Sequence, residues 1–223
     1  TVSLIGSAVF LFPTPAVAAD TMILLKPDRV FDGQKMQQDW VVLVKNNKIL
    51  EAGPMRFKLP ADTRVIELKG LTLLPGLIEG HAHLLLRPYD EVSWDDQVVK
   101  ESRAERVVRA VNHAKATLAA GFTTVRALGT EGAECDDVGL KKAIEKGVIA
   151  GPRMIIATKA LVAKGAYGPK SQNPDLDLPQ GAAEVSGLEQ ISQEVRSQIG
   201  KGADVIKVYA DYRAGRDGEA VPI

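Results

Sequence analysis

Short β-prone runs, separated by turn-forming residues, fill the chain between Thr21 and Leu74. The runs are Met22–Leu25, Trp40–Val44, Lys48–Ala52 and Arg64–Leu68. Asp32-Gly33, Asn46-Asn47 and Gly53-Pro54 punctuate them, as expected of turns between strands. The Asn46-Asn47 pair between two apolar runs predicts a hairpin turn. Residues 20–73 are therefore predicted to form a small antiparallel β domain.

The pattern changes at Leu74, after which buried-type strands alternate with helices. The predicted order is strand Leu77–Leu86, helix Ser93–Ala120, strand Phe122–Leu128, helix Asp137–Ile149 with Asp137 as its cap, strand Arg153–Thr158, polar loop Lys159–Gly187, helix Leu188–Gly200 and strand Ala203–Ala210. In the first helix, apolar residues recur at helical spacing: Val107, Val108, Val111, Ala114 and Leu118. This alternation predicts an α/β fold of parallel strands with helical crossovers. Four such units are half of a (β/α)8 barrel, which needs about 250 residues, and a doubly wound open sheet is the alternative.

The first twenty residues have the pattern of an export signal. An apolar run from Leu4 to Phe12 is followed by two prolines and by Ala16-Val17-Ala18, which resembles a cleavage site. Such a run is too short for a membrane span, which needs about 20 apolar residues. Residues 1–19 are predicted to be the remnant of a signal peptide that begins upstream, and a buried helix is the alternative. The mature protein is then exported, either periplasmic or secreted.

Composition excludes some partners. The chain has 28 Lys and Arg against 28 Asp and Glu, so its formal net charge is zero. No basic surface for nucleic acid or for an anionic membrane is expected. The single cysteine, Cys135, rules out an internal disulfide and a cysteine-based metal site.

His81-Ala82-His83 is the sharpest chemical feature. Residues i and i+2 of a strand project to the same side, so both imidazoles converge on one point, as a metal ion requires. The pair is expected at the carboxyl end of the first barrel strand, where barrel active sites lie. Glu79 is expected on the opposite face as a structural group, and His113 in the following helix is expected to be structural.

Lys207 is the second chemical feature, because it lies in a strand that is predicted to be buried. Lysine is seldom buried without a partner. An internal ion pair or an end-of-strand position is one interpretation. The other is a desolvated lysine that acts as nucleophile or base, since desolvation favours the neutral amine.

The run from Leu74 to Leu84, LPGLIEGHAHL, resembles the opening motif of the amidohydrolase superfamily. Ala120–Arg126, Gly151–Met154 and Lys201–Lys207 resemble the family's second, third and fourth strands, and Ala160–Gly168 fits its long loop. The resemblance is best to the branch with imidazolonepropionase-like proteins and prolidase-type dipeptidases. It implies that residues 74–223 are the first four units of a TIM-type barrel, preceded by part of a small β-sandwich domain.

The resemblance also implies roles for individual residues. His81 and His83 would bind the more buried of two divalent metal ions, with zinc expected, and carbon dioxide would carboxylate Lys207 so that the carbamate bridges both ions. Tyr209, Tyr212 and Arg213 could hold a substrate carboxylate, with Tyr167 as a weaker candidate. Loop packing and surface charge are the alternative roles for these residues.

Two departures from the family pattern affect these roles. Ala127 stands where members commonly carry Asp after the second-strand Arg. The family's two further metal-binding histidines and its catalytic aspartate are expected beyond Ile223, so no catalytic residue is assigned here. Half a barrel would also expose unpaired strand edges, so residues 20–223 alone are expected to aggregate or to pair. The full-length form is expected to be a homo-oligomer.

The leading hypothesis is therefore a metal-dependent hydrolase of amide or peptide C–N bonds that acts on small molecules such as dipeptides. Hydrolysis of a cyclic amide, as in imidazolonepropionase, is the second enzymatic hypothesis. A non-catalytic remnant that binds metal without turnover is the third.

Overall fold

The computed structural model describes residues 21–56, 58–169, 173, 175–210, 213–214 and 219–220, the last two pairs for their backbone alone. The predicted export segment, residues 1–19, therefore lies outside the described residues. The chain divides into two compact units, Thr1–Pro75 and Gly76–Ile223. No helix among the described residues is long and apolar enough to cross a membrane.

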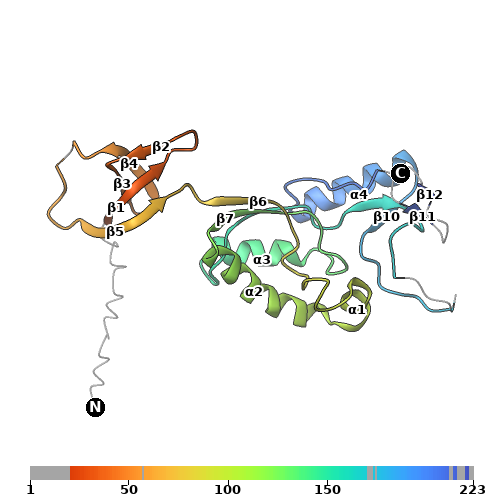
Figure 1. Ribbon diagram of the computed structural model, residues 1–223. Coiled ribbons are helices and arrows are strands. Elements are labelled where there is room, and N and C mark those ends of the chain that lie inside the picture. Colours follow the sequence, from red (N-terminus) through yellow and green to blue (C-terminus); the bar gives the residue numbers. More distant parts are fainter. Residues whose placement is uncertain are drawn as a thin grey trace, which may run out of the picture. The chain divides into compact units, whose positions relative to one another are not determined.

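The first unit is one five-stranded sheet (Figure 1). Its strands are β1 (Met22–Phe31), β2 (Met36–Gln38), β3 (Trp40–Lys45), β4 (Lys48–Pro54) and β5 (Arg64–Leu73). The predicted hairpin at Asn46-Asn47 is confirmed, since Lys45 pairs with Lys48 across it and Asn46 has φ 55°. The short strand β2 had no counterpart in the sequence pattern.

The prediction of a purely antiparallel sheet was wrong, because β5 runs parallel to β1. The chain leaves β4 at Pro54 and returns along the other side of β1 from Arg64 onward, in the same direction as β1. A small core of Leu24, Val41 and Leu43 supports one face of this sheet.

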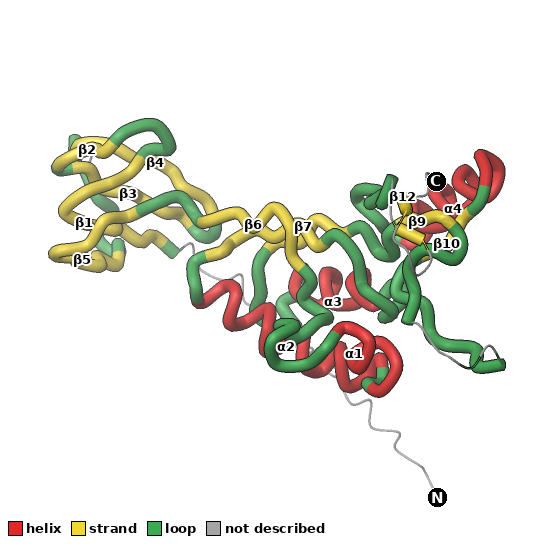
Figure 2. The backbone as a smooth tube through the Cα atoms, turned by 45° about the vertical axis from the view of Figure 1, so that its right-hand side comes forward, coloured by secondary structure: helices red, strands yellow, loops and turns green. Residues whose placement is uncertain are grey.

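The second unit contains a three-stranded parallel sheet with its helices on one side (Figure 2). Its strands are β6 (Leu77–Ala82), β7 (Phe122–Ala127) and β8 (Arg153–Ile156), joined through α2 (Arg103–Ala119) and α3 (Asp136–Glu145). Further elements are α1 (Trp94–Lys100), β9 (Leu161–Ala163), β10 (Ala183–Val185), α4 (Gly187–Lys201), β11 (Arg213–Ala214) and β12 (Glu219–Ala220). The strand–helix alternation expected for a barrel is thus present through β8.

The predicted single helix Ser93–Ala120 is two helices, α1 and α2, with a break at Glu101 and Ser102. The Ser102 hydroxyl accepts a hydrogen bond from the backbone N–H of Glu105, which is the N-cap contact that begins a new helix. The buried face of α2 also differs from the predicted stripe. Ala114 of the predicted stripe is buried, but Val108 is 69% exposed, and Ala110, which the stripe did not include, is buried in its place.

Asp137 does not cap α3, since the N-cap residue is Cys135. The Asp137 side chain instead accepts a hydrogen bond from the backbone N–H of Thr158, just beyond β8. It is a buried carboxylate that joins the first turn of α3 to the carboxyl end of a strand.

The predicted fourth strand, Ala203–Ala210, is not a regular strand and forms only an isolated parallel bridge between Val208 and Leu161. The carboxylate of Asp204 explains the difference. It accepts the hydrogen bond from the backbone N–H of Ile156, which a neighbouring strand carbonyl would otherwise accept. The segment nevertheless runs beside the end of β8, where Asp204 N–H donates to the Ile156 carbonyl. It then runs beside β9, where Leu161 N–H donates to the Lys207 carbonyl.

Candidate functional site

His81 and His83 converge at the carboxyl end of β6, as predicted. Their Nε2 atoms lie 3.2 Å apart, and their ring planes are inclined by 52°. Two imidazole nitrogens on a tetrahedral zinc ion, each at about 2.0–2.1 Å, are separated by about 3.3 Å. The pair therefore fits a shared metal ion.

The His83 ring is held from its other side. Its Nδ1 lies 3.0 Å from the carbonyl oxygen of Gly129, which can only accept a hydrogen bond. The tautomer with hydrogen on Nδ1 makes this bond and leaves the Nε2 lone pair for a metal ion. The backbone also positions His81, because its N–H donates to Glu79 Oε1 at 2.9 Å. Glu79 thus contacts the His81 backbone, which is a supporting role.

The electrostatic surroundings favour the neutral form of His81. Partial desolvation lowers the pKa of His81, and the nearby charges of His83 and Lys207 lower it further. Metal ions bind the neutral imidazole, so these effects support coordination at neutral pH.

Lys207 lies close enough to act on His81 electrostatically, and its side chain is half-buried. Its Nζ lies 4.9 Å from the centre of the Tyr209 ring. In the part of the chain that the structure describes, no group of three or more His, Cys, Asp or Glu side chains could hold a metal ion. The candidate donors there are His81, His83 and Lys207.

The tyrosines predicted to hold a substrate carboxylate are engaged elsewhere. The hydroxyls of Tyr167 and Tyr209 both donate to the carboxylate of Glu131, the second at 3.4 Å. A phenol has one hydrogen to donate, so neither can donate to a substrate carboxylate in this arrangement. Tyr212 lies outside the described residues. Arg213 is described only as backbone in β11.

Sequence reasoning missed Glu131, which is 1% exposed. Its carboxylate also accepts a hydrogen bond from Trp94 Nε1 at 2.9 Å, and its Oε1 lies 3.9 Å from His83 Nδ1. The available signal was an acid between two glycines, Gly129 and Gly132, directly after a barrel-type strand, where functional side chains gather.

The model of the amidohydrolase family matches residues 72–218, which include all three candidate metal donors. The chain belongs to the amidohydrolase family. The fold agrees, since a solved prolidase complexed with N-methylphosphonate-L-proline matches with a TM-score of 0.71 and 28% identity over 91% of this chain. A Xaa-Pro dipeptidase with methionine bound in its active site matches with a TM-score of 0.73 and 25% identity over 89% of this chain. These neighbours support the prolidase-like branch.

Among curated proteins, the dihydroorotase of Syntrophus aciditrophicus (strain SB) is 43% identical over 63 residues, 28% of this chain and 15% of that protein. The chain spans about half the length of the solved relatives, 49% of the prolidase and 51% of the dipeptidase.

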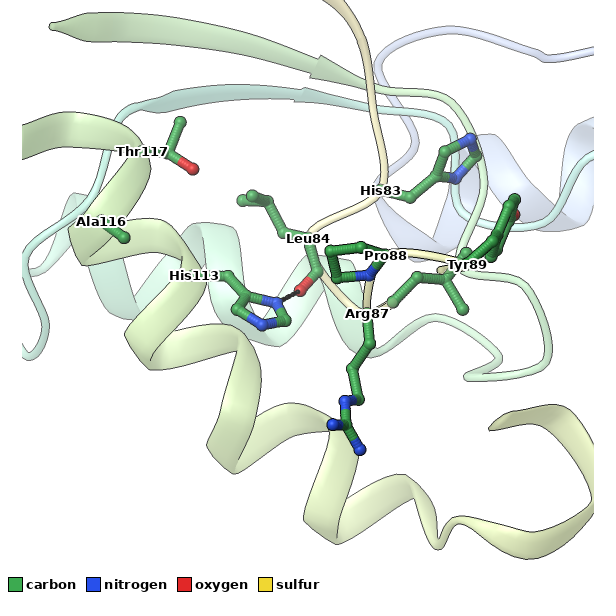
Figure 3. Close-up of a pocket in the computed structure, with 9 residues that line it drawn as sticks. His83, Leu84, Arg87, Pro88, Tyr89, His113, Ala116 and Thr117 are labelled. Atoms are coloured by element: carbon green, nitrogen blue, oxygen red, sulfur yellow. Dashed lines mark hydrogen bonds between the residues drawn. The ribbon is translucent and has the colours of Figure 1, made fainter. Parts of the chain in front are cut away.

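In this amidohydrolase, a cavity of about 430 Å³ lies between the loop after β6 and helix α2 (Figure 3). His83 and Tyr89 line it from the loop, and His113 and Thr117 line it from the helix. His113 Nδ1 lies 2.9 Å from the Leu84 carbonyl oxygen, so this hydrogen bond connects helix α2 to the loop that contains His83. That contact agrees with the predicted structural role of His113.

Proposed function

We propose that the whole protein is a metal-dependent hydrolase of C–N bonds in dipeptide-like substrates. The observation that carries the proposal is the 3.2 Å separation of the His81 and His83 Nε2 atoms in a chain of the amidohydrolase family. The similarity to a prolidase and to a Xaa-Pro dipeptidase supports the dipeptide class.

The proposed site would hold two divalent metal ions, zinc by preference. Its ligands from this chain are His81, His83 and carboxylated Lys207. Bound metal ions would acidify water for attack and would polarise the carbonyl of the C–N bond. Carboxylation turns the Lys207 ammonium, which repels a cation, into an anion with two oxygens. His81 and His83 supply neutral nitrogens, and the Gly129 carbonyl fixes the ring of His83.

Substrate positioning is assigned to the segment that follows Lys207. Arg213 and Tyr212 remain the proposed partners of a substrate carboxylate, with Arg213 suited to a two-bond grip. Tyr167 and Tyr209 act through Glu131 instead, because their hydroxyls are bound to its carboxylate.

The test uses the whole protein, loaded with zinc and supplied with Xaa-Pro dipeptides. His83→Asn is expected to lower zinc affinity by more than about 100-fold and to abolish turnover, since loss of a mere supporting partner already costs about 10–100-fold. His113→Asn is the matched control and should retain zinc, because the His113 ring hydrogen-bonds to the Leu84 carbonyl and is not among the proposed metal ligands. Equal zinc affinity in the wild type and His83→Asn would refute the proposal.

A second candidate is hydrolysis of a cyclic amide, and the local identity to a dihydroorotase supports it. Comparing turnover of dipeptides and of cyclic amides by the same zinc-loaded protein separates the two. Zinc binding without turnover of either class would favour the third hypothesis, a non-catalytic metal-binding remnant.

Export and self-association complete the proposal. The apolar run Leu4–Phe12 followed by Ala16-Val17-Ala18 supports export. Amino-terminal sequencing of the protein from its native source should find a start near Ala19 or Asp20. Sedimentation of the whole protein should show a homo-oligomer, and a monomer would refute that part.

A further inference from the structure

The loop between β7 and α3 carries a carboxylate into the interior. Glu131 has φ 51°, a left-handed conformation that is uncommon for a residue with a side chain. The preceding residue is held at both of its backbone groups, because Thr130 N–H donates to the Thr158 carbonyl and Arg106 Nη2 donates to the Thr130 carbonyl. The surroundings thus hold an unfavourable backbone conformation, as is common where a side chain must be aimed at a site.

Side chains from separate segments meet at this carboxylate. Trp94 of α1 and Tyr167 of the loop after β9 donate to Oε2, and Tyr209, just past Lys207, donates to Oε1. The ring of Tyr167 also contacts each of the other two rings. Tyr167 stacks on Tyr209 with ring centres 5.0 Å apart, and Trp94 meets Tyr167 edge-on at 5.1 Å. Glu131 is therefore the common acceptor that joins these segments.

The same carboxylate faces the metal-binding pair. Glu131 Oε1 lies 3.9 Å from His83 Nδ1, on the side of the ring where the Gly129 carbonyl accepts. Two acceptors on one side favour the tautomer with hydrogen on Nδ1. The opposite nitrogen, Nε2, then presents its lone pair toward His81 Nε2. Gly129 also has to be glycine here, because a Cβ would approach Glu131 Oε1 to 2.9 Å at a φ of 139°.

We propose that Glu131 is a positioning residue of the metal site. Together with the Gly129 carbonyl it favours hydrogen on Nδ1 of His83, and it links the surroundings of that histidine to the aromatic residues Trp94, Tyr167 and Tyr209. This inference rests on the proposed function for its metal ion, whereas the tautomer it predicts is a property of the metal-free protein.

The first measurement is zinc affinity by competition with a chelator in the whole protein. Glu131→Gln keeps the size of the side chain but replaces one carboxylate oxygen, an acceptor, with an NH₂ group that can only donate. The variant is expected to weaken zinc binding by about 10–100-fold. Glu134→Gln is the matched control from the same loop. Glu134 is half-exposed and pairs with Lys159, so its variant should stay within about twofold of the wild type.

The second measurement is the tautomer of His83 from ¹⁵N chemical shifts of metal-free protein, assigned with His83→Asn. The wild type should carry hydrogen on Nδ1. In Glu131→Gln a larger share of hydrogen on Nε2 is expected, because only the Gly129 carbonyl then favours Nδ1. Glu131→Asp should recover part of both effects, which a purely packing role would not produce.

Wild-type zinc affinity and an unchanged tautomer in a folded Glu131→Gln variant would overturn the inference. If that variant does not fold, hydrogen on Nε2 of His83 in the wild type would overturn it instead. A wild type that binds no zinc would contradict the proposed function, and the tautomer would still decide the role of Glu131.

Discussion

Asp137 is expected to make the stability of this protein fall as pH rises through about 6. Its side chain is 2% exposed in the first turn of α3. One oxygen accepts from Thr158 N–H at 2.9 Å, and the other has no hydrogen-bond partner among the described residues. Burial raises the pKa of Asp137 from 3.8 to about 6, against the lowering effect of backbone hydrogen bonds.

The magnitude follows from linkage between protonation and folding. A raised pKa means that the folded protein holds the proton more tightly than the unfolded chain does. The stabilisation is complete below about pH 4 and is lost as pH rises through about 6. A rise from 3.8 to about 6 corresponds to about 3 kcal/mol, at about 1.4 kcal/mol for each pKa unit.

The perturbation is Asp137→Asn, which stays neutral and can still accept the Thr158 hydrogen bond. Relative to the wild type, the variant should gain about 3 kcal/mol in unfolding free energy between pH 4 and pH 7.5. Urea unfolding at a series of pH values measures this difference. Asp136→Asn is the comparison variant, because it removes the neighbouring carboxylate, which is 18% exposed and pairs with Arg103, and leaves Asp137 in place. A wild-type-to-Asp137→Asn difference that stays constant with pH would refute the reasoning.

Two further predictions concern stability in the second unit. Asp204→Ala should lower the free energy of unfolding by about 1–3 kcal/mol, because it removes the acceptor for Ile156 N–H and the ion-pair partner that lies 2.7 Å from Lys141 Nζ. Urea unfolding measures this loss, and an unchanged unfolding midpoint would contradict it. Gly139→Ala should stabilise by about 0.5–1 kcal/mol, because Gly139 is an exposed position of α3 with nothing within 4 Å of an added Cβ; a lower melting temperature would contradict this.

The elements that sequence reasoning predicted well depend on local patterns. β7 and β8 are short β-prone runs, in each of which two residues are buried, and the His81-Ala82-His83 pair follows from the twofold repeat of a strand. The break between α1 and α2 was also local, in the form of Ser102 three residues before Glu105, but the longer apolar periodicity concealed it.

The features that could not be predicted depend on contacts between distant segments. The parallel pairing of β5 with β1 joins strands more than thirty residues apart. Asp204 replaces a strand carbonyl at Ile156 only because the chain brings residues 156 and 204 together. Glu131 is the clearest case, since glutamate is ordinarily exposed and only tertiary structure supplies its three ring donors.

The buried acids of this unit form one continuous line of contacts to the candidate site at His81 and His83. Asp137 holds Thr158 N–H, and Thr158, itself at φ 56°, accepts from Thr130 N–H through its carbonyl. Thr130 precedes Glu131, whose carboxylate faces His83. Two residues with unfavourable left-handed backbones, Thr158 and Glu131, are thus held in place by hydrogen bonds that end at the candidate site. Burial of the Asp137 carboxylate and the left-handed backbone at Thr158 and Glu131 each lower the stability of the fold. Such costs are expected where a structure positions a side chain at a functional site.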